Sequence, residues 1–236
     1  MIYVTGDYHG GRDAAKLHPR LFPEGESLSR GDVVIVCGDF GMPWTGSNDE
    51  AAQLAWLASR PWTTAFVDGN HECFSWYFEQ PEEKWRGGRI HRFADYPSIV
   101  HLMRGQVYRL DGATVFTMGG ATSVDRAWRV PGLSWFPEEL PSAAEYEEAG
   151  RNLDRVGWKV DYVLTHTCAT GLLPRALYPD TGWQTPDLDA LTEFLETLER
   201  RLFYRRWYFG HFHKDRDVDD RHTLLYQRVV RLGKSL

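Results

Sequence analysis

The stretch Gly31-Asp32-Val33-Val34-Ile35-Val36-Cys37-Gly38-Asp39 decides how the rest of the chain is interpreted. Its unbroken β-branched run from Val33 to Val36 is typical of a strand that is buried on both faces of a sheet. Because the run ends in Gly-Asp, the strand delivers the carboxylate of Asp39 to the crevice where open α/β sheets place their chemistry. We therefore interpret Asp39 as a metal ligand.

Four other strand-like runs also end in clusters of Asp, Asn or His. The clusters are Asp7-Tyr8-His9 after residues 2–6, Gly69-Asn70-His71-Glu72 after residues 64–67, His166 after residues 162–165, and His211-Phe212-His213 after residues 207–210. Alternate residues of an extended segment face the same way, so Asp7 and His9 can converge on one ion. Packing alone does not explain five hydrophobic runs that each end in metal-type ligands.

The third cluster combines two different kinds of polar side chain. Asn70 offers a neutral carbonyl oxygen, which can complete a metal site without adding charge. His71 follows it directly, so its side chain points in another direction and is free for acid or base chemistry.

Composition limits the classes of function. The chain has 236 residues and a net charge of −6, and we expect one domain, 1–236, that buries a sizeable core. The acidic balance disfavours a broad grip on extended nucleic acid or on an anionic membrane, but a small phosphate ester held by local cations fits. Three cysteines without C-x-x-C spacing indicate a reducing compartment. Met1 leads directly into a strand and no apolar run is long enough for a membrane span, so we expect a cytoplasmic protein.

The remaining pattern predicts an alternation of helices and strands. Asp111-Gly112 predicts a hairpin between strands 106–110 and 113–118, which belong to a second sheet. Helices are predicted at 49–59, within 73–89, at 143–156 and at 187–203, the last with Leu188, Leu191, Leu195 and Leu198 on one face. We expect one final strand near 223–231 and two long loops, 119–141 and 167–186.

Taken in order, D-x-H, G-D, G-N-H-E, a strand-terminal T-H and G-H-x-H resemble the calcineurin-like metallophosphoesterase superfamily. The resemblance extends over almost the whole chain and includes all five motif blocks of that family. Each block alone is a weak signal, but the ordered set is specific. The resemblance implies a four-layer α/β sandwich of the αββα type, in which two mixed β-sheets are flanked by helices and a dinuclear site lies at one edge.

The resemblance also implies a set of metal ligands. One cation would be held by Asp7, His9, Asp39 and His213 and the other by Asp39, Asn70, His166 and His211, so that Asp39 bridges the two. Two divalent cations roughly 3.5–4 Å apart can clamp an in-line displacement at phosphorus and lower the pKa of a bridging water. Imidazole, carboxylate and amide ligands without thiolate suit manganese, which we expect first, with iron or zinc as alternatives.

One departure from the family pattern affects substrate binding. Members that act on phosphoproteins carry Asp-Arg-Gly shortly after the bridging Asp, where the Arg grips phosphate and the Asp orients the catalytic His. Residues 40–46 contain neither residue, which disfavours a protein phosphatase and leaves the partner of His71 open, with Glu72 as one candidate. The phosphate-binding cation would come instead from Arg12, Arg126 or Arg129, and we favour Arg129 because it lies in the long loop 119–141.

The expected activity is hydrolysis of a small phosphomonoester or phosphodiester. In the mechanism that the resemblance implies, a metal-bridging hydroxide attacks phosphorus and His71 assists the leaving group. Two alternatives stay open. One is a nuclease on short single-stranded nucleic acid, against which the acidic balance counts, and the other is a non-catalytic scaffold that keeps the fold without metals, against which the intact ligand set argues.

Overall fold

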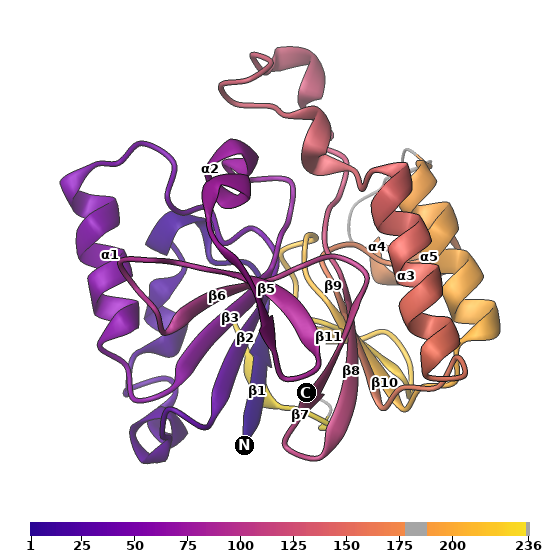
Figure 1. Ribbon diagram of the computed structural model, residues 1–236, viewed down its shortest axis with the longest axis horizontal. Helices are drawn as coiled ribbons and strands as arrows, with labels where there is room; N and C mark the ends of the chain where they lie inside the picture. Colours follow the sequence, from indigo (N-terminus) through magenta and orange to yellow (C-terminus); the bar gives the residue numbers. More distant parts are fainter. Residues whose placement is uncertain (178–187, 235–236) are drawn as a thin grey trace.

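The computed structural model describes residues 1–177 and 188–234. Two mixed β-sheets lie face to face, and helices cover their outer faces (Figure 1). The expected four-layer αββα sandwich is confirmed. Within the described residues, none of the helices is both long and apolar enough to span a bilayer.

Within residues 1–177 and 188–234, the first sheet has seven strands, in the order β13-β1-β2-β3-β6-β5-β4. Its centre is parallel, because β1, β2, β3 and β6 run the same way, whereas β13, β5 and β4 are antiparallel to their neighbours. The bounds are β1 Ile2–Thr5, β2 Val33–Cys37, β3 Thr63–Val67, β4 Glu82–Trp85, β5 Gly88–Arg92, β6 Ile99–Leu102 and β13 Val229–Arg231.

The second sheet has six strands in the described part of the chain, in the order β11-β12-β10-β9-β8-β7. Strands β8, β9, β10 and β12 are parallel, and the predicted hairpin β7–β8 supplies one edge with Leu110 opposite Ala113. The bounds are β7 Gln106–Leu110, β8 Ala113–Met118, β9 Tyr162–Thr165, β10 Arg206–Phe209, β11 Arg216–Asp217 and β12 His222–Leu224.

Five α-helices lie in the described residues, and short 3₁₀ turns accompany them. The helices are α1 Asn48–Ala58, α2 Phe74–Glu79, α3 Ala143–Arg155, α4 Leu173–Leu177 and α5 Ala190–Arg201, and the 3₁₀ turns are η1 His9–Gly11, η2 Ala14–Leu17, η3 Pro23–Ser27, η4 Arg126–Trp128, η5 Pro137–Glu139 and η6 Thr170–Leu172. Side chains of Ser47, Ser142 and Asp189 cap α1, α3 and α5 by accepting a backbone N–H of the first turn. Helix α3 has the expected capping box with Glu145.

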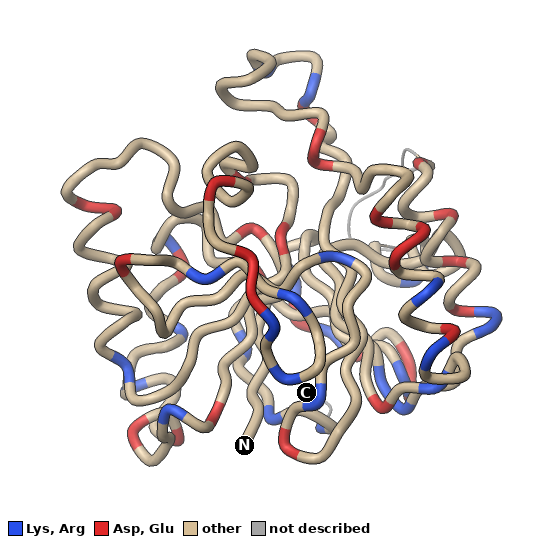
Figure 2. The backbone as a smooth tube through the Cα atoms, in the orientation of Figure 1, with Lys and Arg blue, Asp and Glu red and all other residues tan. Residues whose placement is uncertain are grey.

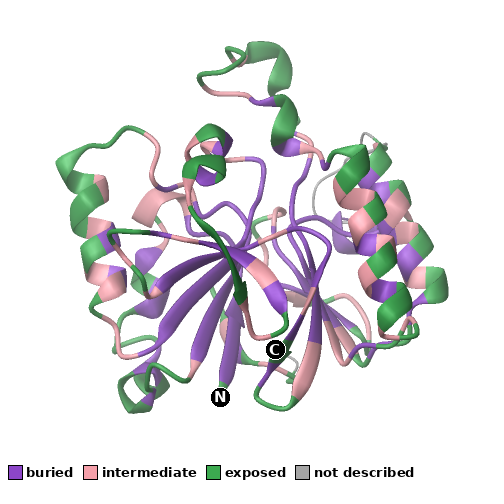
Figure 3. Cartoon of the chain, in the orientation of Figure 1, coloured by how far each residue is buried: buried purple, intermediate pink, exposed green. Residues whose placement is uncertain are grey.

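The core has three layers of side chains, as a four-layer sandwich requires. Along β2, Val34 and Val36 pack with the apolar cluster under α1, whereas Val33 and Ile35 point between the two sheets. The third cluster fills the space between the second sheet and helices α3 and α5. Buried residues accordingly mark the central strands, whereas the edge strand β4 and the outer sides of the helices are exposed (Figure 3). Charged residues of both signs lie along the outer helices α3 and α5 (Figure 2).

Several predicted elements differ from the structure. The single strand expected near 223–231 is wrong: β12 belongs to the second sheet and β13 to the first, because the chain crosses between the sheets at residues 225–228. The loop expected at 167–186 contains η6 and α4 within its described part, and residues 178–186 lie outside the described residues. The last helix begins at Ala190 rather than 187, and Leu188 is 58% exposed rather than part of its buried face. The sequence pattern predicts short β segments from residue 89 onward but not strand β4, which forms a hairpin with β5.

Candidate metal centre

All seven ligand candidates follow strands that end at the same edge of the sandwich. Asp7, Asp39 and Asn70 follow β1, β2 and β3 of the first sheet, and His166, His211 and His213 follow β9 and β10 of the second, while His9 lies two residues beyond Asp7. Because the strands in each group are parallel, their carboxyl ends meet. Four of these residues have left-handed backbone conformations with positive φ, namely His9, Asp39, His211 and His213. Residues other than glycine rarely adopt this backbone conformation, and the exceptions are concentrated at functional sites.

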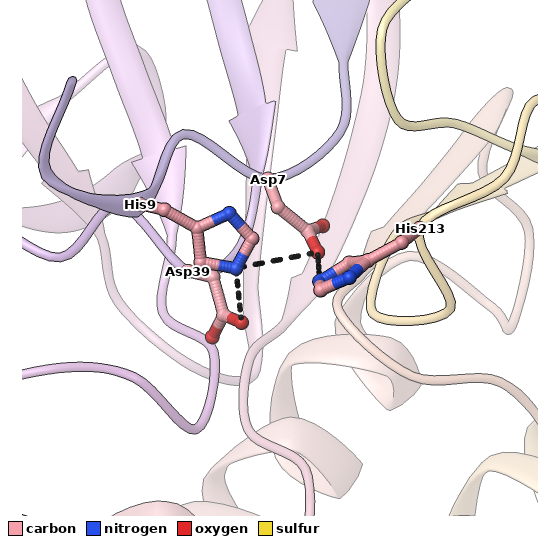
Figure 4. A group of neighbouring side chains, drawn as sticks. All are labelled: Asp7, His9, Asp39 and His213. Carbon is pink, nitrogen blue, oxygen red and sulfur yellow. Dashed lines mark ion pairs between the residues drawn. The ribbon is translucent and has the colours of Figure 1, made fainter. Parts of the chain in front are cut away.

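One group of ligands surrounds a single point. Ligand atoms of Asp7, His9, Asp39 and His213 all lie within 4.8 Å of one another. Nε2 of His213 is 3.1 Å from Oδ2 of Asp7, and Nε2 of His9 is 3.3 Å from Oδ2 of Asp39 (Figure 4). These four side chains form what we name the first cation position.

A second group lies on the other side of Asp39. Nε2 of His166 is 3.2 Å from Oδ1 of Asp39 and 3.1 Å from Oδ1 of Asn70. The ring of His211 meets that of His166 edge to face, with 4.9 Å between their centroids. We name Asp39, Asn70, His166 and His211 the second cation position. It is a looser candidate, because among the described residues only the first group gathers three or more His, Cys, Asp or Glu ligand atoms within 4.8 Å of one another.

Hydrogen bonds behind the ligands fix which atoms face the two positions. Nδ1 of His9 lies 2.6 Å from a carboxylate oxygen of Asp13, and Nδ1 of His166 lies 2.8 Å from the carbonyl oxygen of Cys37. Both bonds place the proton on Nδ1 and leave Nε2 as the ligand atom. Nδ2 of Asn70 donates to Oγ of Ser123, so its amide oxygen faces His166.

Glycines next to the ligands leave the space that these side chains occupy. A Cβ on Gly69 would lie 2.1 Å from Oδ1 of Asp39, and a Cβ on Gly38 would lie 2.0 Å from Nδ1 of His166. Gly38 also has a φ of +94°. The Gly-Asp and Gly-Asn pairs of the sequence motifs are therefore required by close packing of strand ends around the ligands.

The protonation of the ligands reflects an excess of negative charge. Burial alone would lower the pKa of His166, but the charge of Asp39, a hydrogen bond to it and the charge of Asp7 raise that pKa to about 10. Burial likewise opposes protonation of His9, but hydrogen bonds to Asp39 and Asp13 and the charges of Asp39 and Asp7 raise the pKa of His9 to about 9. Bound cations would satisfy the same carboxylates and release these protons.

The residues of the first cation position fit a divalent cation. Oδ2 of Asp7 is buried and forms no hydrogen bond of acceptable geometry with a described residue, although Nε2 of His213 is close to it. A buried carboxylate oxygen without a donor costs free energy that a cation would recover. The donor set contains imidazole, carboxylate and amide groups but no thiolate, which suits manganese, iron or zinc.

His71 lies beside the ligands, and its partner is Arg129. The imidazole of His71 is about one-third exposed, with Nε2 4.0 Å from Oδ2 of Asp39. Nη1 and Nη2 of Arg129 lie 3.1 and 3.2 Å from its two ring nitrogens. Burial and, to a smaller extent, Arg129 lower the pKa of His71 against the opposing charge of Asp39, so the imidazole is neutral near pH 7.

The other two arginine candidates are not brought to this point. Arg12 is exposed, and its side chain forms no hydrogen bond or ion pair with another described residue. The guanidinium of Arg126 lies over the ring of Trp135, 4.4 Å from the centroid. Of the three guanidinium groups, only that of Arg129 contacts a described side chain of the site.

Glu72 does not orient His71. Its buried carboxylate accepts the backbone N–H groups of Phe40, Gly41 and Gly69 and the hydroxyl of Tyr77. Side chains of adjacent residues point in different directions, which is why Glu72 turns inward while His71 faces the site. Glu72 joins the loop after β2 to the loop after β3 and so holds Asp39 and Asn70 in register.

The sequence pattern did not identify the residues that support the ligands from behind. Asp13 contacts His9, and the buried Lys16 donates to the carbonyl oxygens of Gly6, Asp7 and Tyr226. Tyr226 is 210 positions from Lys16, so their pairing leaves no local signal in the sequence. Asp13 is four residues after His9, which is the one spacing that could have been noticed.

Comparison with known proteins agrees with this geometry. A family model described as calcineurin-like phosphoesterase matches residues 1–215. No curated protein matches the chain. Among solved structures, the crystal structure of a protein of unknown function from Aquifex aeolicus is 13% identical, with 86% of this chain and 87% of that chain covered and a TM-score of 0.37. A likeness this remote carries no argument about function.

Proposed function

The chain belongs to the calcineurin-like phosphoesterase family, and from that premise we propose that it hydrolyses a small phosphomonoester or phosphodiester with two divalent cations. Manganese is the first choice of metal, with iron or zinc as alternatives. The observation that carries the proposal is the placement of Asp39, whose Oδ2 faces His9 and whose Oδ1 faces His166. One carboxylate directed at both groups of ligands suits a bridging ligand.

The chemistry divides between the cations and the protein. When bound, two divalent cations would polarise the phosphate and lower the pKa of a water molecule so that a nucleophile is available near neutral pH. The protein holds the ligands in place, and the hydrogen bonds to Asp13 and Cys37 keep the Nε2 atoms of His9 and His166 directed at the two positions.

Arg129 is the residue that we assign to the phosphate. Its guanidinium is positioned by the carboxylate of Asp125, 2.6 Å from Nε, and by the carbonyl oxygen of Ser134, 3.0 Å from Nη1. A guanidinium offers a planar fork of donors that matches two phosphate oxygens. Arg129 would therefore replace the arginine that family members acting on phosphoproteins carry after the bridging Asp.

His71 is the residue that we assign to the leaving group. A neutral imidazole has one protonated nitrogen, which can donate to a developing alkoxide or phenoxide oxygen. A phosphate bound to the Arg129 guanidinium would compete with His71 for its N–H donors, which would leave a ring nitrogen of His71 available to the substrate. The backbone N–H of His71 also donates to Oδ1 of Asp39, which ties its position to the bridging carboxylate.

Activity on model esters tests the proposal. The protein is dialysed against a chelator, reloaded with Mn²⁺, and assayed on para-nitrophenyl phosphate and on bis-para-nitrophenyl phosphate. We expect hydrolysis of at least one ester only after reloading, and its loss in D39N. The matched control D95N, which changes an exposed Asp outside the site, should keep wild-type activity.

The same assay separates the alternatives. Hydrolysis of the diester alone would identify a phosphodiesterase, and cleavage of a short single-stranded oligonucleotide at comparable kcat/KM would favour a nuclease. Absence of turnover on all three substrates with manganese, iron and zinc would contradict the proposal and favour a scaffold.

A further inference from the structure

The loop between β12 and β13, residues 225–228, lies against the first cation position. It is the segment in which the chain leaves the second sheet and joins the first. It also lies beyond residue 215, where the family match ends. Family membership therefore gives these residues no role, and their contacts have to be read from the structure.

Tyr226 contacts two of the side chains that shape this position. Its ring stacks on the ring of His213, with 4.9 Å between centroids and 19° between planes. Its hydroxyl donates to Oδ1 of Asp13 at 3.1 Å. The side chain of His213 is half exposed and has few neighbours to restrain it. Stacking on the Tyr226 ring therefore contributes much of the contact that holds the His213 imidazole in one orientation.

Gln227 completes the support of Asp13. Its Nε2 donates to Oδ1 of Asp13 at 2.8 Å, while Oδ2 of Asp13 lies 2.6 Å from Nδ1 of His9. Asp13 is thus held by two side chains of the loop and in turn holds His9. A carboxylate behind a ligating imidazole fixes its ring and raises its basicity.

The loop is itself anchored on both sides of the site. The carboxylate of Asp215 accepts the backbone N–H groups of Tyr226, Gln227 and Arg228 at 2.8, 3.0 and 3.1 Å. The ammonium group of Lys16 donates to the carbonyl oxygen of Tyr226 at 2.7 Å and also to that of Asp7. Asp215, which anchors the loop on one side, lies two residues after His213. Lys16, which anchors it on the other side, also contacts Asp7.

We propose that Tyr226 and Gln227 are positioning residues for the first cation position: Tyr226 seats His213 by stacking, and both hold Asp13 against His9. The proposal rests on cation binding as assigned under the proposed function. It predicts an asymmetry, because none of these contacts reaches the second position. There, His166 is oriented by Cys37 and Asn70 by Ser123.

The expected loss of metal affinity can be estimated from other metal sites in proteins. Removal of a group that orients a ligating histidine typically weakens metal affinity about 10- to 100-fold. We expect Y226L, which loses both the ring and the hydroxyl, to weaken binding of one of two Mn²⁺ ions by about tenfold or more. Y226F keeps the ring on His213 and should recover most of that loss.

The test is a titration of the chelator-treated protein with Mn²⁺. Binding is measured by calorimetry, and free Mn²⁺ is measured by electron paramagnetic resonance. Wild type, Y226L, Y226F and Q227A are compared with the control Y96L. Tyr96 is a half-buried tyrosine whose hydroxyl lies 3.5 Å from the carbonyl oxygen of Ala51, away from the ligands. Circular dichroism and thermal unfolding of the metal-free proteins measure any general loss of stability.

Each outcome decides between the two roles. The proposal is supported if the affinity for one Mn²⁺ ion falls in Y226L and, to a smaller extent, in Q227A, while both affinities are unchanged in Y96L. This holds even if Y226L is less stable than wild type. Wild-type affinity for both ions in a folded Y226L overturns it, as does an equal loss in Y96L. If wild type binds one ion and Y226L binds it more weakly, the positioning role holds and the dinuclear proposal fails. If wild type binds no ion, both proposals fail. Should Y226L not fold, Q227A decides: weaker binding of one ion supports the proposal, and wild-type affinity for both ions overturns it.

Discussion

Arg129 and His71 are 58 positions apart in the sequence, yet the guanidinium of one lies against the imidazole of the other at 3.1 and 3.2 Å. A neutral imidazole has one unprotonated nitrogen, so only one of these two contacts is a hydrogen bond at a time. The segment between β8 and α3, which projects from the body of the molecule, brings Arg129 to this point (Figure 1). Asp125 and Ser134 of the same segment hold its guanidinium there.

Replacement of Arg129 should impair substrate turnover. In R129A the phosphate of the substrate loses the two hydrogen bonds from the guanidinium. We therefore expect kcat/KM on a para-nitrophenyl ester to fall by about 10²-fold or more. R129K should recover little of it, because an ammonium lacks the planar fork. R126A is the matched control, since Arg126 stacks on Trp135 and does not contact His71. Equal losses in R129A and R126A would contradict the assignment.

Replacement of His71 should separate turnover from metal binding. In H71N the leaving group loses its proton donor, and kcat is expected to fall by about 10²- to 10⁴-fold. The two cation positions do not use the His71 ring, so metal content by elemental analysis should stay at the wild-type value. Loss of metal together with activity would show that His71 is a ligand.

Substitution of Gly69 should disturb the bridging carboxylate. The Cβ of G69A would meet Oδ1 of Asp39 at 2.1 Å, so Asp39 or the backbone must move. We expect loss of metal and a decrease of at least roughly 2 kcal/mol in the free energy of unfolding.

The control for Gly69 is G150A in α3, where nothing beyond the backbone of the helix itself lies within 4 Å of the added Cβ. A helix gains about 0.5–1 kcal/mol when alanine replaces glycine, so urea unfolding should show this variant to be slightly more stable. Retention of metal by G69A at the wild-type level would refute the packing argument.

The stability of the metal-free protein should fall in mild acid because of His91. Burial and the charge of His101 lower the pKa of His91 to about 4, below its ordinary value of 6.5. The unfolded chain therefore binds more protons between these values, and stability present above pH 6.5 is lost as the pH falls toward 4. At pH 5 the loss attributable to His91 is roughly 2 kcal/mol.

Urea unfolding at pH 7.5 and pH 5 measures this term. H91Q cannot titrate, so the difference between wild type and H91Q should change by that amount between the two pH values. H18Q, which replaces an exposed histidine, should follow wild type at both. An H91Q protein that loses as much stability as wild type would exclude His91 as the cause.

The sequence predicts the fold where local patterns and sheet geometry agree. Asp111-Gly112 places the hairpin β7–β8, because a two-residue turn of this type fixes the register of its strands. The β-branched run before Asp39 predicts a buried central strand, and β2 is buried at every residue. The ligand candidates converge for the same reason, since parallel strands place their carboxyl ends at one edge.

Contacts between distant segments could not be predicted in this way. Residues 223–231 have the composition of one strand, but hydrogen bonds to Asp215 at residues 226–228 divide it and send its two halves to different sheets. Glu72 lies next to His71 in sequence and points away from it in space. Leu188 fits the apolar stripe of α5 but precedes its cap, Asp189, and is therefore exposed.

The number of cations bound per chain tests the central claim most directly. Chelator-treated protein is equilibrated with Mn²⁺, and the bound metal is measured by elemental analysis, with D39N in parallel. We predict two ions per wild-type chain and loss of both in D39N, because Oδ1 and Oδ2 of Asp39 face different ligand groups. One ion or none in wild type, or two ions retained in D39N, would contradict a centre built on a shared carboxylate.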